Sequence, residues 1–205
     1  MPDGVIQFRL HHAPGPAAAA AELAALSLLR DALHRRGGIG RDPARYGGLG
    51  YGNVSTRLAG DAFRISATQT GHCTTLAPSD WVTVLRAAPD ANELWSEGPS
   101  LPSSESLTHA SIYATSTARF VAHVHHPAIW RSARAGAIRL AATHPSATYG
   151  TPAMAAELSR VAAISEVPFA AVMTGHEDGL MLAAADPTQL LALLDRLVER
   201  APTER

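Results

Sequence analysis

Residues 120–126, Phe-Val-Ala-His-Val-His-His, constrain the fold more than any other stretch of the chain. Successive side chains of a β-strand point to opposite faces, so His123 and His125 would share one face, about 7 Å apart at the backbone. In a helix they would diverge by about 200°. Because imidazole is the commonest zinc ligand, the pair is typical of a strand that supplies two metal ligands, with an ordinary strand edge as the alternative.

Composition excludes several classes of protein. We expect residues 1–205 to form a single domain with a substantial core, with residues 1–16 as an N-terminal extension. The formal net charge is −1 and 17% of the residues are charged, so no basic surface favours a nucleic acid. Apolar runs are shorter than the roughly 20 residues of a membrane span. Met1–Leu10 lacks the pattern of a secretory signal, and Cys73 is the only cysteine, so we expect a cytoplasmic protein without an intrachain disulfide.

Apolar periodicity and turn residues predict one mixed α/β domain. The predicted helices cover about residues 17–36, 104–116 and 151–164, and a last one begins at Asp186-Pro187. The predicted strands are 54–58, 63–67, 81–85, 120–126, 169–173 and 180–184, the last two as a hairpin-like pair. Residues 38–53 are rich in glycine and are expected to form an ordered or semi-mobile loop, not a linker.

Two short clusters offer groups that bind an anion. Gly52-Asn53 precedes the strand at 54–58 and combines backbone N–H groups with a side-chain amide. Thr70 and Gly71 follow the next strand, where a hydroxyl and a closely approaching backbone could hold phosphate or carboxylate oxygens. For Gly52-Asn53 a simple turn is the alternative interpretation.

Two further clusters carry titratable side chains. In Pro102-Ser103-Ser104-Glu105 a serine would cap the following helix, whose N-terminal amides favour anions, and capping alone would also explain the motif. His109, one helical turn after Glu105, is expected to make a structural hydrogen bond. In the turn Gly175-His-Glu-Asp-Gly179, His176 could complete a three-histidine metal set, and the two acidic residues could orient a histidine or bind metal themselves.

The order of these motifs resembles the class II aldolase/adducin family: Gly-Asn-Val-Ser, Thr-Gly, Pro-Ser-Ser-Glu with a following His and Tyr, His-x-His, and a late histidine in a glycine turn. They span roughly residues 20–195. The resemblance implies a three-layer α/β/α fold around a mainly antiparallel central sheet, commonly in a homotetramer. Activities in the family include sugar-phosphate aldolases, epimerases, a dehydratase and decarboxylases.

The resemblance also implies residue roles. His123, His125 and His176 would bind Zn²⁺ or another divalent metal such as Mn²⁺, Co²⁺ or Fe²⁺, and Glu105 would be the acid/base and sometimes a further ligand. The phosphate or carboxylate of a small-molecule substrate would be held by Asn53, Thr70, Gly71, Ser103 and Ser104. A metal that holds a hydroxy-carbonyl unit stabilises an enediolate while a carboxylate moves the proton. We therefore predict a metal-dependent, aldolase-type lyase, with an epimerase, a dehydratase or a non-catalytic adducin-like domain as alternatives.

The chain departs from the family pattern in three places. The turn Gly-His-Glu-Asp-Gly replaces the usual Asn-His-Gly or His-His-Gly, residues 38–51 form a glycine-rich insertion, and no tyrosine follows Tyr149. In the sugar-phosphate aldolases of the family, the C-terminal tail helps to supply a tyrosine proton donor to a neighbouring site. Tyr113 or Tyr149 could take that role, or either could belong to the core or to an interface.

Overall fold

The computed structural model describes residues 5–201, in which nine strands form one sheet with the order β1-β7-β6-β5-β4-β8-β11-β10-β9. β1 pairs parallel with β7, β9 pairs parallel with β10, and every other neighbouring pair in this sheet is antiparallel. The strands of this sheet are β1 (Arg9–Pro14), β4 (Asn53–Arg57), β5 (Phe63–Ser66), β6 (Trp81–Ala88), β7 (Glu93–Gly98), β8 (Phe120–His125), β9 (Ala141–Ala142), β10 (Phe169–Val172) and β11 (Gly179–Ala184). A separate two-stranded sheet joins β2 (Gly40–Arg41) to β3 (Gly50–Tyr51).

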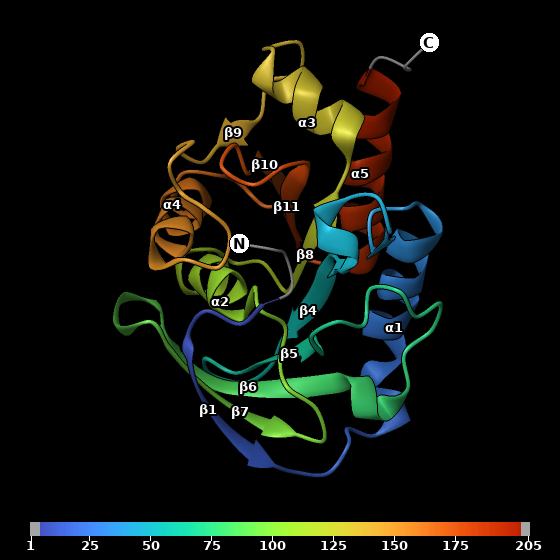
Figure 1. The fold of residues 1–205 in the computed structure, drawn as a ribbon, viewed down its shortest axis with the longest axis vertical. Helices are drawn as coiled ribbons and strands as arrows, with labels where there is room; N and C mark the ends of the chain where they lie inside the picture. Colours follow the sequence, from blue (N-terminus) through green and yellow to red (C-terminus); the bar gives the residue numbers. More distant parts are fainter. Residues whose placement is uncertain (1–4, 202–205) are drawn as a thin grey trace.

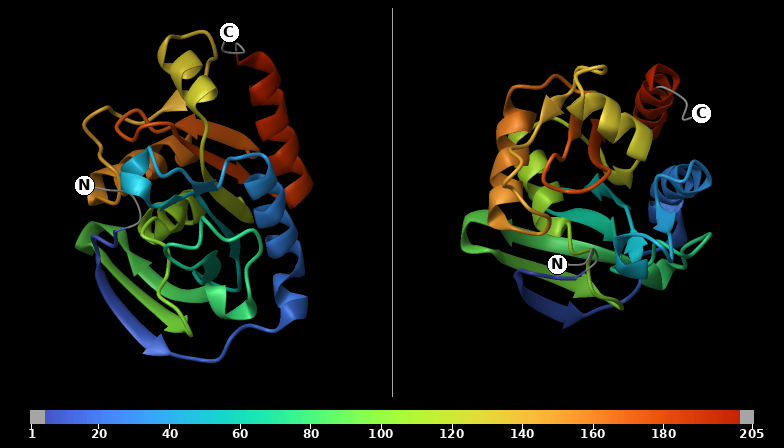
Figure 2. Two further views of the ribbon diagram at one scale, coloured as in Figure 1. Left: turned by 45° about the vertical axis from the view of Figure 1, so that its right-hand side comes forward. Right: turned by 45° about the horizontal axis from the view of Figure 1, so that its top comes forward.

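Helices flank the large sheet on both sides (Figures 1 and 2). They are α1 (Ala20–Arg35), α2 (Ser106–Thr115), α3 (Pro127–Arg134), α4 (Pro152–Ala163) and α5 (Pro187–Arg200). In α3, α4 and α5 a proline opens the helix directly after a residue whose side chain accepts a bond from the first turn. Proline suits this first position because its missing N–H would have no partner inside the helix.

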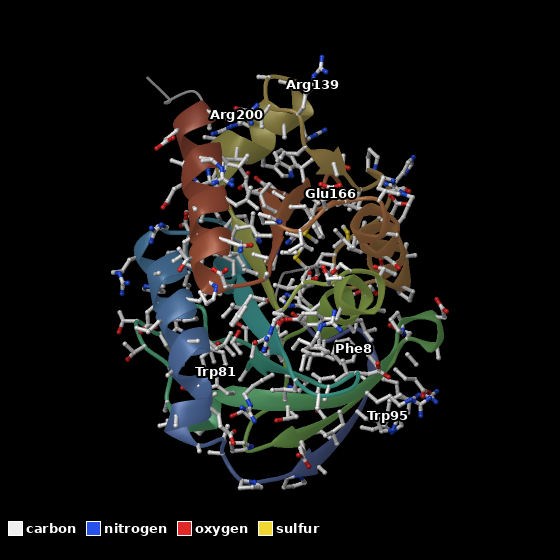
Figure 3. The ribbon with its side chains drawn as sticks, turned by 180° about the vertical axis from the view of Figure 1, so that it is seen from behind. Phe8, Trp81, Trp95, Arg139, Glu166 and Arg200 are labelled. Carbon is white, nitrogen blue, oxygen red and sulfur yellow. The ribbon has the colours of Figure 1, made fainter. Side chains whose placement is uncertain are left out.

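The core lies on both faces of the sheet because side chains alternate along each strand. In β8, Val121 belongs to a cluster that includes residues of α2 and α4, and Val124 to a second cluster that includes residues of α1, α3 and α5. Buried Phe8 belongs to the first cluster and lies near α2, and buried Trp81 belongs to the second and lies near α1 (Figure 3). The alternation sends His123 and His125 toward the face of Val121.

The structure confirms the predicted α/β class with a large, mostly antiparallel sheet flanked by helices. The stricter three-layer description stays a prediction. The six predicted strands and four predicted helices are present, and β10 and β11 form the expected hairpin pair. No helix in residues 5–201 is long and apolar enough to cross a membrane.

Several elements escaped the sequence analysis. Residues 9–14, inside the expected N-terminal extension, form the edge strand β1. Strand β7 was also not predicted; buried and more exposed residues alternate along it, and the more exposed ones include Glu93 and Glu97. Helix α3 begins directly after β8, with no loop between them. The proposal that Ser103 or Ser104 caps α2 is wrong, because Glu105 holds the cap position and its side chain makes no capping bond. The hydroxyl of Ser103 instead accepts a bond from the N–H of Glu105, at 3.3 Å, in the turn just before the helix.

Candidate metal centre and substrate cleft

The side chains of His123, His125 and His176 meet at their Nε2 atoms. The three Nε2–Nε2 distances are 3.1, 3.2 and 3.1 Å, and all three side chains are buried. Four-coordinate zinc with Zn–N bonds of about 2.0–2.1 Å separates its ligand atoms by about 3.3 Å. Among residues 5–201 this is the only group of three or more histidine, cysteine and acidic side chains that is arranged to hold a metal ion.

The strand register explains why these histidines meet. β8 lies between β4 and β11, with His123 opposite Asn53 on one side and opposite Met181 on the other. The turn before β11 brings His176 over the same face. Gly179 makes room for it, since a Cβ at this position would overlap the His176 ring.

Burial keeps these imidazoles neutral, as a metal ligand must be. Desolvation lowers the pKa of His123 to about 4 and holds the pKa of His125 and of His176 well below its usual value. The Nδ1 atom of His123 lies 3.2 Å from the carbonyl oxygen of Leu180, to which its N–H can donate, which leaves the Nε2 lone pair for a metal. The donor set therefore fits a divalent ion.

A cleft opens beside the three histidines. Its lining includes eight of the nine predicted site residues, namely Asn53, Thr70, Gly71, Ser103, Ser104, Glu105, His123 and His125. The ninth, His176, joins through its contacts with the other two histidines. Glu105 is 1% exposed, and the buried Oδ1 of Asn53 has no hydrogen-bond partner among the described residues. The structure thus brings together five segments that are far apart in the sequence.

A family comparison agrees with this geometry. The model of the class II aldolase and adducin N-terminal domain matches residues 44–201. The chain belongs to this family. The resemblance inferred from the motifs is confirmed, and the three histidines of this class II aldolase family member are positioned to hold a metal ion.

Solved structures show the same fold. L-fuculose-1-phosphate aldolase from Thermus thermophilus is 18% identical, with a TM-score of 0.59 over 91% of this chain and 100% of that one. A sugar-phosphate aldolase from Thermotoga maritima is 12% identical, with a TM-score of 0.64 over 85% and 89%. YgbL from Klebsiella pneumoniae, proposed to be an aldolase, epimerase or decarboxylase, is 15% identical, with a TM-score of 0.62 over 89% and 88%. No curated protein matches the chain.

Sequence reasoning missed the buried arginine that supports the Thr70-Gly71 loop. Arg30 of α1 is 1% exposed and donates hydrogen bonds to the carbonyl oxygens of Thr70 and Thr74, at 2.9 and 3.0 Å. Gly71 packs so closely on Gly40 and Tyr51 that a Cβ would overlap their backbone atoms. Arg30 thus fixes the loop and brings a buried positive charge beneath it, although its helical position gave no sign of this role.

One of the two tyrosines considered as proton donors lies in the cleft. Tyr149 lines the cleft, its hydroxyl bonds that of Ser104, and its ring stacks on His176 with the centroids 5.1 Å apart. Tyr113 is buried in the core, and its hydroxyl forms a 2.7 Å hydrogen bond with the hydroxyl of Ser55. Of these two tyrosines, Tyr149 is the one that reaches the cleft.

Three further histidines, His109, His126 and His144, lie outside the cluster. His109 makes the expected hydrogen bond, with its Nδ1 2.7 Å from the hydroxyl of Ser55. His126 accepts a bond from the N–H of Ile129 at the start of α3 and takes no part in the cluster. His144 is exposed.

The metal-free protein should lose stability as the pH falls below about 6.5. Burial lowers the pKa of His109 to about 3 and depresses the pKa of all three clustered histidines, whereas unfolded histidine titrates near 6.5. The unfolded chain therefore binds more protons at acid pH, so stability is full above about pH 6.5 and declines below it. Urea unfolding of the metal-free protein at pH 7.5 and pH 5.0 measures this difference. Equal unfolding free energies at both pH values would contradict the burial of neutral histidines.

Proposed function

We propose that this protein is a metal-dependent lyase that cleaves a carbon–carbon bond in a small hydroxy-carbonyl compound that carries a phosphate or carboxylate group. One observation carries the proposal: three buried imidazoles converge at 3.1–3.2 Å beside a cleft lined by a carboxylate and by several hydroxyl groups. Family membership supports it, because the fold is shared with sugar-phosphate aldolases.

His123, His125 and His176 would hold Zn²⁺, or alternatively Mn²⁺, Co²⁺ or Fe²⁺. When bound, the ion supplies Lewis-acid polarisation of the substrate's hydroxy-carbonyl unit. The histidines fix its position, and because they are neutral and buried, no proton competes for their Nε2 atoms near pH 7.

Glu105 would move the proton. Aldol cleavage removes the proton of a hydroxyl group, breaks the neighbouring carbon–carbon bond, and returns a proton to the carbon that the aldehyde leaves. Glu105 lines the cleft with His123 and His125, and its backbone is held by the turn that precedes α2. A carboxylate at this position can accept the first proton and donate the second, so the net reaction consumes no acid or base.

The anionic group of the substrate would lie at the Thr70-Gly71 loop. Asn53, Ser103 and Ser104 line the same cleft and offer hydroxyl and amide donors. The guanidinium of Arg30 lies beneath the loop and favours negative charge above it. These donors and a buried cation suit a phosphate or a carboxylate.

Metal and product analysis test the proposal. The purified protein should contain close to one divalent ion per chain, and incubation with L-fuculose 1-phosphate and a panel of ketose phosphates should release an aldehyde fragment. Interconversion of pentulose phosphates without fragmentation would identify the epimerase alternative, and loss of water would identify the dehydratase. Bound metal without turnover across hydroxy-aldehydes and hydroxy-acids would favour the adducin-like alternative.

Assembly, domain organisation and location are also proposals. By analogy with the family, we propose a homotetramer of single-domain subunits in a three-layer α/β/α arrangement. We also propose a cytoplasmic location, because the chain has a single cysteine. Light scattering of the purified protein would test the tetramer, and cell fractionation would test the location.

Arg30→Met should weaken anion binding and destabilise the protein. The substitution removes the charge beneath the loop and the guanidinium hydrogen bonds to the carbonyl oxygens of Thr70 and Thr74. Hydrogen bonds that involve a charged group contribute about 1.5–3 kcal/mol. Calorimetric titration with inorganic phosphate and urea unfolding measure the two effects. Arg36→Met, at the C-cap of the same helix, is the matched control, because Arg36 pairs with Asp195 at the surface, where such pairs contribute about 0–1 kcal/mol. Phosphate affinity equal to that of the wild type would contradict the role of Arg30.

A further inference from the structure

A strap of residues 42–49, between β2 and β3, lies against the end of β8 (Figure 1). It contains a single 3-10 turn at Tyr46–Gly48, and its three residues have φ angles of 52°, 69° and 72°. Positive φ is rare for a residue with a side chain, so the position of Tyr46 must be stabilised by its contacts. The structure provides such contacts at both ends of the Tyr46 side chain.

The ring of Tyr46 covers one of the three clustered histidines. Its centroid lies 4.4 Å from that of His125 in an edge-on arrangement, and the ring of Tyr51 lies 5.1 Å from the same histidine. The rings of Tyr46 and Tyr51 therefore limit the movement of the His125 imidazole. These two rings also contact each other, with their centroids 5.1 Å apart.

The hydroxyl of Tyr46 reaches the turn that carries the third histidine. It donates a hydrogen bond to Oδ2 of Asp178 at 2.5 Å, and Arg45 forms ion pairs with Asp178 and, at 3.0 Å, with Glu177. Asp178 is 2% exposed, lies two residues after His176, and has a φ of 60°. Its carbonyl oxygen accepts a bond from the N–H of His126, at 2.9 Å, just beyond β8.

The strap and this turn are two of the places where the sequence departs from the family pattern, and here they contact each other. Tyr46 joins His125 of β8 to the turn that carries His176. Its ring packs against His125, and its hydroxyl bonds Asp178 in that turn. Tyr46 is not itself among the residues that line the cleft and supplies no ligand atom to the histidine cluster, so it acts through the histidines.

We propose that Tyr46 and Asp178 are positioning residues that hold His125 and His176 in the geometry required to bind the metal ion. The inference rests on the proposed metal site. Contacts that orient metal ligands contribute about 10- to 100-fold to metal affinity. Loss of the Tyr46–Asp178 bond should therefore weaken metal binding without removing any ligand.

The test compares Tyr46→Phe with Tyr51→Phe. Both variants lose one phenolic hydroxyl and keep a ring next to His125. Within residues 5–201, however, the Tyr51 hydroxyl donates only a 3.3 Å bond, to the carbonyl oxygen of Gly37. Zinc affinity is measured by competition with a chromophoric chelator, and the visible spectrum of the Co²⁺ form reports ligand geometry. We expect Tyr46→Phe to bind zinc about 10- to 100-fold more weakly with an altered Co²⁺ spectrum, and Tyr51→Phe to resemble the wild type.

Asp178→Asn is the second variant. Asparagine tolerates positive φ and can still accept the Tyr46 hydrogen bond, but it removes the charge that pairs with Arg45. We expect an intermediate loss of zinc affinity, which does not depend on whether Tyr46→Phe folds. Wild-type affinity and spectrum in folded Tyr46→Phe and Asp178→Asn would overturn the inference while leaving the metal site intact. A wild-type protein that binds no zinc, Co²⁺ or Mn²⁺ would overturn both the inference and the proposed function.

Discussion

His176→Ala should lose the metal ion. The substitution removes one of three converging imidazoles and leaves His123 and His125, which a single strand supplies. We expect metal affinity to fall by at least about 100-fold, the upper end of what removal of an orienting contact costs. Elemental analysis after dialysis against a weak chelator measures the bound metal, and activity should fall in proportion to the metal content.

His126→Ala is the matched control. His126 follows His125 directly, but it accepts a bond at the start of α3 and lies outside the cluster. The control should keep its metal and lose about 0.5–2 kcal/mol of unfolding free energy through the missing helix cap. Full metal content in His176→Ala would instead mean that Glu105 or the acidic pair at 177–178 supplies the third ligand.

The strand pair was readable from sequence because both ligands lie on one local element. Two residues that are two positions apart in a β-strand point to the same face of the sheet. In the structure the Nε2 atoms of His123 and His125 lie 3.1 Å apart. His176 was found by its place in a glycine-bounded turn and by family order. The glycine at 179, which the turn pattern included, proves to be the position that admits the His176 ring.

The supporting residues were not readable, because their partners are distant in sequence and leave no local spacing. Tyr46 and Asp178 are separated by 132 positions, and Arg30 and Thr70 by 40. Arg30 occupies a leucine-rich helix where an arginine is expected on the solvent side, yet it is 1% exposed. Strands β1 and β7 escaped for a related reason, since their partly exposed faces carry polar and charged residues.

Glu105→Gln should abolish most of the turnover while the metal and the anion still bind. Glutamine keeps the size and hydrogen-bonding capacity of the side chain but cannot exchange a proton near pH 7. Positioned acid/base groups contribute about 100- to 10,000-fold to rate, so kcat should fall by that factor. The measurement is kcat and KM on the substrate that product analysis identifies, together with exchange in D₂O of the C–H proton on the product carbon that the aldehyde leaves.

Metal content and phosphate affinity of the Glu105→Gln protein distinguish a proton-carrying Glu105 from a Glu105 that is a further metal ligand. As a proton carrier, Glu105 contributes nothing to the binding of the ion, so Glu105→Gln should match the wild type in zinc content and in calorimetric phosphate affinity. As a further metal ligand, its loss should lower the zinc content, and turnover should recover when zinc is added in excess. Wild-type exchange of the C–H proton in a zinc-loaded Glu105→Gln protein would exclude proton transfer by Glu105, and the acid/base would then have to be sought among the other groups of the cleft. Tyr149 is the first of these, because its hydroxyl meets Ser104 and its ring stacks on His176.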